Sequence, residues 1–146
     1  MCIRDSIFTS NIITSGDAYN FLVDDANGCG PVVVSGTFNC SCTTSAGTMN
    51  LIPLSICEGQ TATATHFGDE VLDANDMLQY VLHDGSGASL GNIISTNSVP
   101  EFTFQTGMSF GTTYYVSAIA GNMIAGNVDL TDACLSVSQG LSLIHI

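Results

Sequence analysis

The chain has 146 residues, a sequence pI near 4.1, and 13 Asp and Glu residues against a single basic residue, Arg4. A surface with this charge cannot neutralise phosphates, so nucleic-acid binding is excluded as a function, and anionic membranes would repel it. Because 45% of the residues are apolar and no apolar run is long enough to span a bilayer, the composition predicts a folded chain without membrane insertion.

The two ends are predicted to be foreign to the natural protein. Residues 1–6 and 141–146 can be encoded by DNA segments that are reverse complements of each other. These segments resemble the transposase recognition sequence used to prepare sequencing libraries. Because sequences added during preparation are left out of fold arguments, we expect the natural sequence to cover residues 7–140 and to continue beyond both ends. A short terminal strand at each end is the alternative.

Between these ends the residue types favour strands and turns. Thr, Val, Ile and Phe are common, the helix formers Lys, Arg and Glu are scarce, and turn residues interrupt the apolar stretches. The expected strands cover residues 46–52, 61–66, 77–84, 90–96, 101–105, 113–120 and 134–138. About seven strands in roughly 100 residues predict an all-β, immunoglobulin-like β-sandwich over residues 40–140. Tyr114 has the position of a tyrosine corner, and it shares one strand face with Val116 and Ala118.

Residues 7–39 are predicted to be the C-terminal strands of a preceding, similar sandwich. Gly16–Val23 resembles Gly111–Ala118, and each segment is followed by an Asn/Gly loop, a cysteine and a short strand, at residues 32–35 and 135–138. The equivalent Gly and Tyr residues lie 95 positions apart, which indicates tandem sandwich domains rather than a solenoid. Two unrelated strand pairs with similar turns are the alternative. We expect the first half-domain to fold poorly or to dock only loosely in isolation.

Five short motifs occur in an order and spacing that resemble a known class of repeats. They are Ala26–Cys29, Cys42–Met49, Ile56–Ala62, Gly111–Val116 and Asp132–Val137. Together they resemble repeats of very large surface proteins of gliding, Bacteroidota-type bacteria. The resemblance implies tandem immunoglobulin- or PKD-like domains in secreted, adhesin-like proteins associated with gliding motility. It brings no common catalytic residues.

Five cysteines lie outside the two ends, at Cys29, Cys40, Cys42, Cys57 and Cys134. Their density in an acidic β chain indicates disulfides and an extracellular or cell-surface location. The first and last strands of a sandwich can start at the same end, which favours Cys42 or Cys40 paired with Cys134. Cys57 with Cys134 and Cys42 with Cys57 are the alternatives. Zinc is a weaker interpretation, because Cys40-Ser41-Cys42 has no second ligand pair.

Acidic residues concentrate in two loops that are expected to emerge at the same end of the sandwich. They are Asp69, Glu70, Asp73 and Asp76 in one loop, and Asp129 and Asp132 in the other. Carboxylates and backbone carbonyls could form a hard-oxygen site for a structural calcium ion, the one cofactor that the sequence suggests. We favour the alternative, in which these are solvated acidic loops.

No catalytic constellation is recognisable, so the sequence predicts that the chain is not an enzyme. His66 and His83 have no obvious partner and are expected as strand-edge side chains. We expect a non-catalytic structural or adhesive module of a large secreted surface protein. Its partners would be neighbouring repeats of the same chain and a surface glycan or protein. The alternative is an accessory carbohydrate- or protein-binding domain of a secreted hydrolase, which would need exposed aromatics among Tyr80, Tyr114 and Tyr115.

Overall fold

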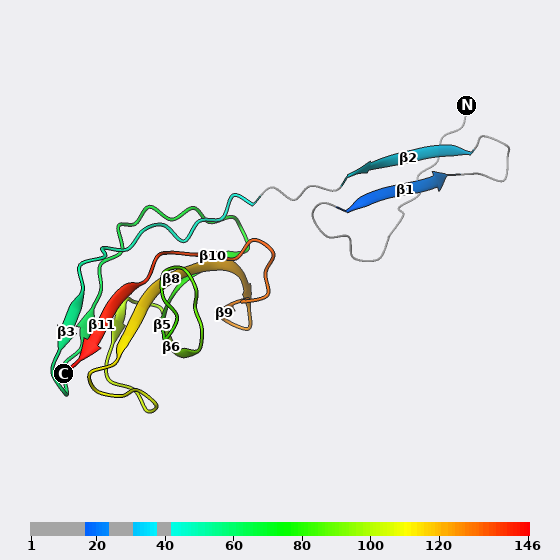
Figure 1. The fold of residues 1–146 in the computed structure, drawn as a ribbon. Coiled ribbons are helices and arrows are strands. Elements are labelled where there is room, and N and C mark those ends of the chain that lie inside the picture. The colour runs from blue at the N-terminus through cyan, green and yellow to red at the C-terminus, as the bar shows by residue number, and fades with distance from the viewer. Residues whose placement is uncertain (1–16, 24–30, 38–41) are drawn as a thin grey trace. The chain divides into compact units, whose positions relative to one another are not determined.

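A computed structural model describes residues 17–23, 31–37 and 42–146 (Figure 1). Every helix or strand assigned in these residues is a β-strand, which confirms the all-β prediction. The chain divides into two compact units, Met1–Cys42 and Thr43–Ile146. The boundary that the sequence predicted between residues 39 and 40 lies outside the described residues. In the described part of the chain, no helix has the length and apolar character needed to cross a membrane.

The first unit contains an antiparallel pair of strands, β1 (Ala18–Val23) and β2 (Val32–Thr37). β-branched and aromatic residues dominate both strands, as is typical of β-structure. The ring of Tyr19 stacks on that of Phe21 with centroids 5.5 Å apart. The Tyr19 ring also lies over Gly36, where an added Cβ atom would come within 2.6 Å of the tyrosine hydroxyl. Glycine at this position therefore lets the tyrosine ring lie flat across the neighbouring strand.

The second unit is built around one mixed sheet of seven strands. Five of them follow each other in the hydrogen-bonded order β3 (Leu54–Ile56), β11 (Leu141–His145), β8 (Thr113–Ile124), β5 (Asp76–His83) and β6 (Ile93–Asn97). Two short strands, β9 (Asn127–Val128) and β10 (Ser136–Val137), also pair with β8. β3 and β11 are parallel and the other pairs are antiparallel, so the first and last strands of the unit lie side by side (Figure 1).

A smaller layer packs against this sheet. It contains β4 (Ala62–Thr63), which pairs antiparallel with β7 (Glu101–Phe102). The segment before β3 contributes two isolated antiparallel bridges, Ser45–Val71 and Met49–His66. Of the strand predicted over residues 46–52, only Met49 takes part in strand pairing, through its bridge to His66.

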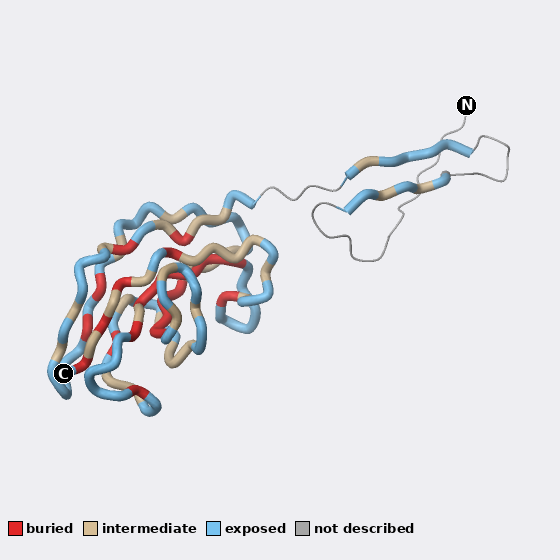
Figure 2. Tube along the Cα trace, in the orientation of Figure 1, coloured by how far each residue is buried: buried red, intermediate tan, exposed pale blue. Residues whose placement is uncertain are grey.

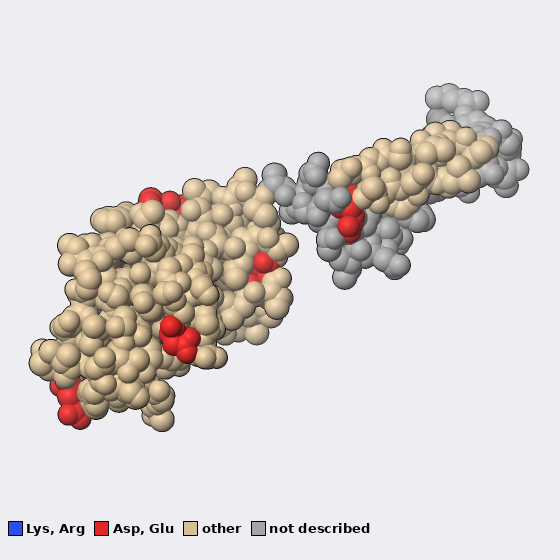
Figure 3. All heavy atoms as spheres, in the orientation of Figure 1, with Lys and Arg blue, Asp and Glu red and all other residues tan. Residues whose placement is uncertain are grey.

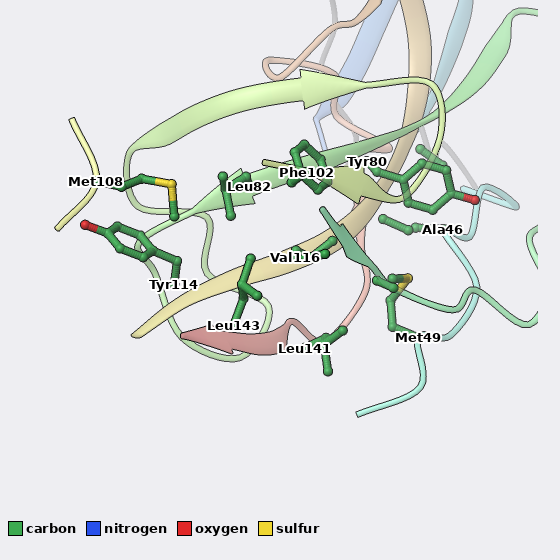
Figure 4. Packing of buried hydrophobic residues seen from close by; sticks show 14 residues of the cluster. Ala46, Met49, Tyr80, Leu82, Phe102, Met108, Tyr114, Val116, Leu141 and Leu143 are labelled. Carbon is green, nitrogen blue, oxygen red and sulfur yellow. The ribbon is translucent and has the colours of Figure 1, made fainter. Parts of the chain in front are cut away.

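The apolar side chains of the two layers meet in the main core (Figures 2 and 4). Strands β5, β8 and β11 supply alternating buried residues, namely Tyr80, Leu82, Tyr114, Val116, Ala118, Leu141 and Leu143. The smaller layer supplies Ala62, Ala64 and Phe102. The small alanine side chains leave room for the two layers to pack closely. The common face predicted for Tyr114, Val116 and Ala118 is confirmed.

The two central strands are also covered on their other face. Val81 of β5, Ile119 of β8 and Val128 of β9 form a second, smaller buried cluster. The β8–β9 hairpin is held over this cluster by Gln79, whose Oε1 accepts a 2.9 Å hydrogen bond from the Val128 backbone N–H. β5 and β8 are therefore buried on both faces, which makes them the central strands of the unit.

Tyr114 fixes the turn that precedes β8. Its hydroxyl accepts a 2.8 Å hydrogen bond from the backbone N–H of Ser109, five residues upstream. The tyrosine is buried, and Met108 of the same turn lies beside its ring (Figure 4). This is the contact that the sequence predicted for a tyrosine corner.

Three strands of the main sheet were not expected from the sequence. β9 lies between the strands predicted over residues 113–120 and 134–138, where a loop was expected. β3 follows Pro53, where the preceding strand was predicted to end. β11 lies in residues 141–146, which were set aside as foreign, and a terminal strand was the alternative there. Its residues alternate in burial, with Leu141, Leu143 and His145 buried. Any segment with this period of two can place one set of side chains in a core, whatever its origin.

Candidate functional site

The acidic residues of the first loop are engaged with their own surroundings. The Asp69 carboxylate accepts hydrogen bonds from the Thr48 backbone N–H at 2.7 Å and the Thr48 hydroxyl at 2.8 Å. These bonds hold the pKa of Asp69 below its ordinary value. The Glu70 carboxylate lies 3.7 Å from Nδ1 of His66, whose Nε2 is 2.8 Å from the Ala46 carbonyl oxygen. The Asp69 carboxylate therefore helps to hold the loop against the segment that precedes β3, whereas Glu70 Oε2 has no hydrogen-bond partner among the described residues.

Asp73 and Asp76 organise the turn that leads into β5. Asp76 accepts hydrogen bonds from the Thr44 hydroxyl at 2.6 Å and from the Asp73 backbone N–H at 3.1 Å. Asp73 in turn accepts a hydrogen bond from the Asn75 backbone N–H at 3.0 Å. Aspartate side chains commonly stabilise turns through such bonds to nearby backbone groups.

The carboxylates of the second acidic loop also accept hydrogen bonds from nearby residues. Asp129 accepts hydrogen bonds from the backbone N–H and the hydroxyl of Thr131 at 2.8 and 2.7 Å. Asp132 accepts bonds from the backbone N–H groups of Asn122 at 2.7 Å and Cys134 at 2.9 Å. These backbone donors lower the pKa of Asp132, with Asn122 making the larger contribution.

The two acidic loops approach each other without forming a common cluster. Asp76 lies opposite Asn122 in the β5–β8 register, and the N–H of Asn122 is bonded to Asp132, so parts of both loops reach the same end of the sheet. Within residues 17–23, 31–37 and 42–146, however, no three His, Cys, Asp or Glu side chains converge as metal ligands. Figure 3 shows acidic side chains of the visible face as separate spots. Calcium needs six to eight converging oxygens, whereas most of these carboxylates accept hydrogen bonds from N–H and hydroxyl groups, either in their own turn or in a neighbouring segment.

A disulfide joins Cys42 to Cys134. This is one of the two pairings that the sequence favoured, and it excludes both alternatives, which used Cys57. Cys57 is a free, exposed thiol. Cys29 and Cys40 lie outside the described residues. Because Cys42 is bonded to another cysteine, it is not available as a thiolate ligand for the zinc site considered at Cys40-Ser41-Cys42.

His83 is a buried residue, and its prediction as a strand-edge side chain was wrong. Its Nε2 lies 2.9 Å from the Ser117 hydroxyl, its ring stacks on Tyr115, and it is fully inaccessible to solvent. Burial lowers the pKa of His83. Its burial follows from the central position of β5, since both faces of that strand are covered. The sequence did give one signal, because His83 lies two residues after the apolar Val81 and so shares its strand face.

The tyrosines do not form a common exposed surface. Tyr80 and Tyr114 are buried in the main core, and Tyr115 on the opposite face of β8 is partly exposed. An aromatic platform for sugar stacking would need at least two of these rings to be exposed. The two buried rings weigh against such a platform here.

No family model, curated protein or solved structure matches the chain. The resemblance to repeats of bacterial surface proteins therefore rests on the motifs themselves.

Proposed function

We propose that the chain is part of a non-catalytic repeat protein that is secreted to the cell surface, and that the second unit is one immunoglobulin-like module acting as a spacer under tension. The first unit would be the last strands of the preceding module. The acidic surface and the disulfide support an extracellular location. The free thiol of Cys57 is exposed and has no role in this proposal.

The strand order supports an immunoglobulin-like assignment. Such sandwiches place strands C, F and G next to one another in one sheet and strands B and E in the other. In the second unit, β5, β8 and β11 are consecutive neighbours in the main sheet, and β4 pairs with β7 in the smaller layer. The core differs from that of antibody domains, because Val116 lies where they carry a cysteine and the chain has no Trp.

The position of the disulfide is the single observation that carries the spacer function. Cys42 stands immediately before the second unit, and Cys134 precedes its last two strands. A pulling force that enters the unit from the N-terminal side reaches Cys134 through the sulfur–sulfur bond. The strands between the two cysteines are therefore bypassed. The bond also closes a loop of about 90 residues, which the chain-entropy model predicts to stabilise the fold by about 4–5 kcal/mol.

Single-molecule force extension tests this function. Under non-reducing conditions, the stretch between Cys42 and Cys134 should not add to the extension when the chain is pulled from its ends. In Cys134→Ser it should add about 300 Å, because about 90 residues extend by roughly 3.3–3.6 Å each. The matched control Cys57→Ser should behave as the unmodified chain does. Equal extension of the unmodified chain and Cys134→Ser would contradict the proposal.

A further inference from the structure

The strand pair of the first unit can be aligned with two strands of the second unit. In the second unit, Thr113 of β8 lies opposite Ile144 of β11, and each successive pair follows in antiparallel order. Ala18, the residue 95 positions before Thr113, begins β1 and lies opposite Thr37 at the end of β2. By position in the sheet, β1 therefore corresponds to β8, and β2 corresponds to β11, whatever the origin of residues 141–146. The sequence comparison had instead matched residues 32–35 with residues 135–138, which contain β10.

Equivalent positions in the two strand pairs differ sharply in burial. Val34 of β2 lies opposite Phe21 and corresponds to Leu141 of β11, which lies opposite Val116. Leu141 is 1% exposed, whereas Val34 is 46% exposed. Val32, two residues before Val34 on the same face, is 55% exposed. The first unit thus presents to solvent an apolar face that is the core face in the second unit.

The second unit shows what covers such a face. β8 pairs along its other edge with β5, from Asp76 opposite Asn122 to His83 opposite Tyr115. β11 pairs along its other edge with β3, and the smaller layer packs over the face of both strands. Among the described residues, β1 and β2 pair only with each other. In the second unit, residues 43–110 provide the strands that pair with and cover these two positions.

We propose that the β1–β2 pair is a docking surface for a second copy of a segment like residues 43–110, with a β5-type strand along the edge of β1. This inference rests on the proposed function, because it treats the two units as successive repeats, and it specifies the partner and the register. The β5-type strand runs antiparallel to β1. Position 81 of the added segment lies opposite Leu22, as Val81 lies opposite Ser117 in the second unit. The smaller layer of the added segment covers Val32 and Val34.

The test inserts a copy of residues 43–110 between Ser15 and Gly16 of the full chain, with Cys57→Ser in the inserted copy. Gly16 then follows the copy as Gly111 follows Phe110 in the second unit. Hydrogen exchange of the β1 amides should slow by about tenfold or more, because a paired and covered strand opens rarely. The matched control carries Leu82→Asp in the inserted copy, since Leu82 is fully buried. Equal exchange of β1 in the two proteins would overturn the proposal.

A disulfide-trapping measurement checks the register even when the inserted copy docks only part of the time. Val81→Cys in the inserted copy together with Leu22→Cys should form a disulfide within one chain, which peptide mapping detects. The control pairs the same Val81→Cys with Ala18→Cys, four residues along the same face of β1, and should form little bond. Absence of the first bond, or equal yield of both, would overturn the proposal. Neither result affects the force test, which depends only on Cys42 and Cys134.

Discussion

The β1–β2 pair and the β8–β11 pair are similar local structures in two different surroundings. Both are antiparallel, and both carry a tyrosine one residue after the start of the first strand. β8 and β11 are buried between further strands, while Leu22, Val32, Val33 and Val34 of the first unit are exposed. Local alternation is enough to form the pair. Burial, and with it most of the stability, comes from strands that lie far away in the sequence.

The largest expected effect comes from placing a charge at equivalent positions of the two pairs. Val116→Asp should lower the free energy of unfolding of the second unit by more than about 4 kcal/mol, because Val116 is fully buried in the main core. Phe21→Asp, at the equivalent position of β1, should leave the unfolding midpoint of the second unit unchanged. Urea unfolding followed by near-UV circular dichroism measures both. If Phe21→Asp greatly lowered the stability of the second unit, the expected difference between the two strand pairs would be wrong.

His145 is the residue of β11 whose side chain is least suited to its buried surroundings. It is fully buried, its ring meets Phe104 edge-on at 5.3 Å, and neither ring nitrogen has a hydrogen-bond partner within the described residues. Removing an unpaired buried polar group should help, so His145→Leu should stabilise the second unit by about 1–3 kcal/mol. Ser142→Ala on the opposite face of β11 serves as the control, with little change in the urea midpoint. A destabilised His145→Leu protein would show that the histidine makes a useful contact.

The same histidine and His83 should make only the second unit sensitive to mild acid. Burial lowers the pKa of both below the ordinary value of 6.5, so the unfolded chain binds protons first. Their neutral forms impose no penalty above that pH, and the free energy of unfolding should fall as the pH drops below it. Urea midpoints at about pH 7.5 and about pH 5.5 measure the effect. His145→Leu combined with His83→Gln should flatten this dependence, and an unchanged slope would contradict the assignment to these residues.

The aspartates contribute in a different pH range. Hydrogen bonds lower the pKa of Asp69, Asp84 and Asp132 below the ordinary value of 3.8, with the Asn92 side chain the main donor to Asp84. Their stabilising contribution is complete above that value and is lost only as the pH falls through their lowered pKa values. The change between about pH 7.5 and about pH 5.5 therefore reports on the histidines.

A smaller effect on stability is expected when Tyr114 of β8, but not Tyr19 of β1, is replaced. Tyr114→Phe removes the acceptor for the Ser109 N–H and should destabilise the second unit by about 1 kcal/mol. Tyr19→Phe changes the equivalent residue of β1 and should not alter the urea midpoint of the second unit. An equal midpoint for Tyr114→Phe and the unmodified chain would show that the corner hydrogen bond adds no stability.

The smallest expected effect is that of calcium. The six candidate carboxylates do not converge as metal ligands, and those of Asp69, Asp76, Asp129 and Asp132 each accept two hydrogen bonds. Thermal unfolding with millimolar calcium and with EDTA should therefore give the same midpoint. A clear rise with calcium would show ligand binding to the folded state, and repeating it with Asp73→Asn and Asp76→Asn would locate the ion.

The sequence predicted the elements whose information is local. The strands near residues 77–84 and 113–120 were found because each carries apolar residues at every second position, such as Leu78, Tyr80 and Leu82 in the first. β3 was missed because it has three residues after a proline, and its strand character comes from pairing with β11, far along the chain. The burial of His83 was missed for a similar reason, because both faces of β5 are covered only once β8 and β9 are in place.

For the candidate site too, the sequence predicted some features and could not predict others. Topology alone narrowed the disulfide to Cys42 or Cys40 with Cys134, but two cysteines separated by one residue cannot be distinguished by such an argument. The spacing of the acidic residues predicted two loops at one end of the sandwich. It could not show that Asp69, Asp73 and Asp132 turn toward backbone N–H groups, since that depends on the conformation of each turn.

Peptide mapping of the non-reduced chain tests the central claim most directly, namely that one disulfide closes the second unit from its start to its last strands. Because Arg4 is the only basic residue, cleavage after Asp and Glu replaces trypsin. Fragment spectra should show Cys134 joined to Cys42, with Cys57 free to react with an alkylating reagent. Cys134 recovered as a free thiol, or joined to Cys57, would contradict the account.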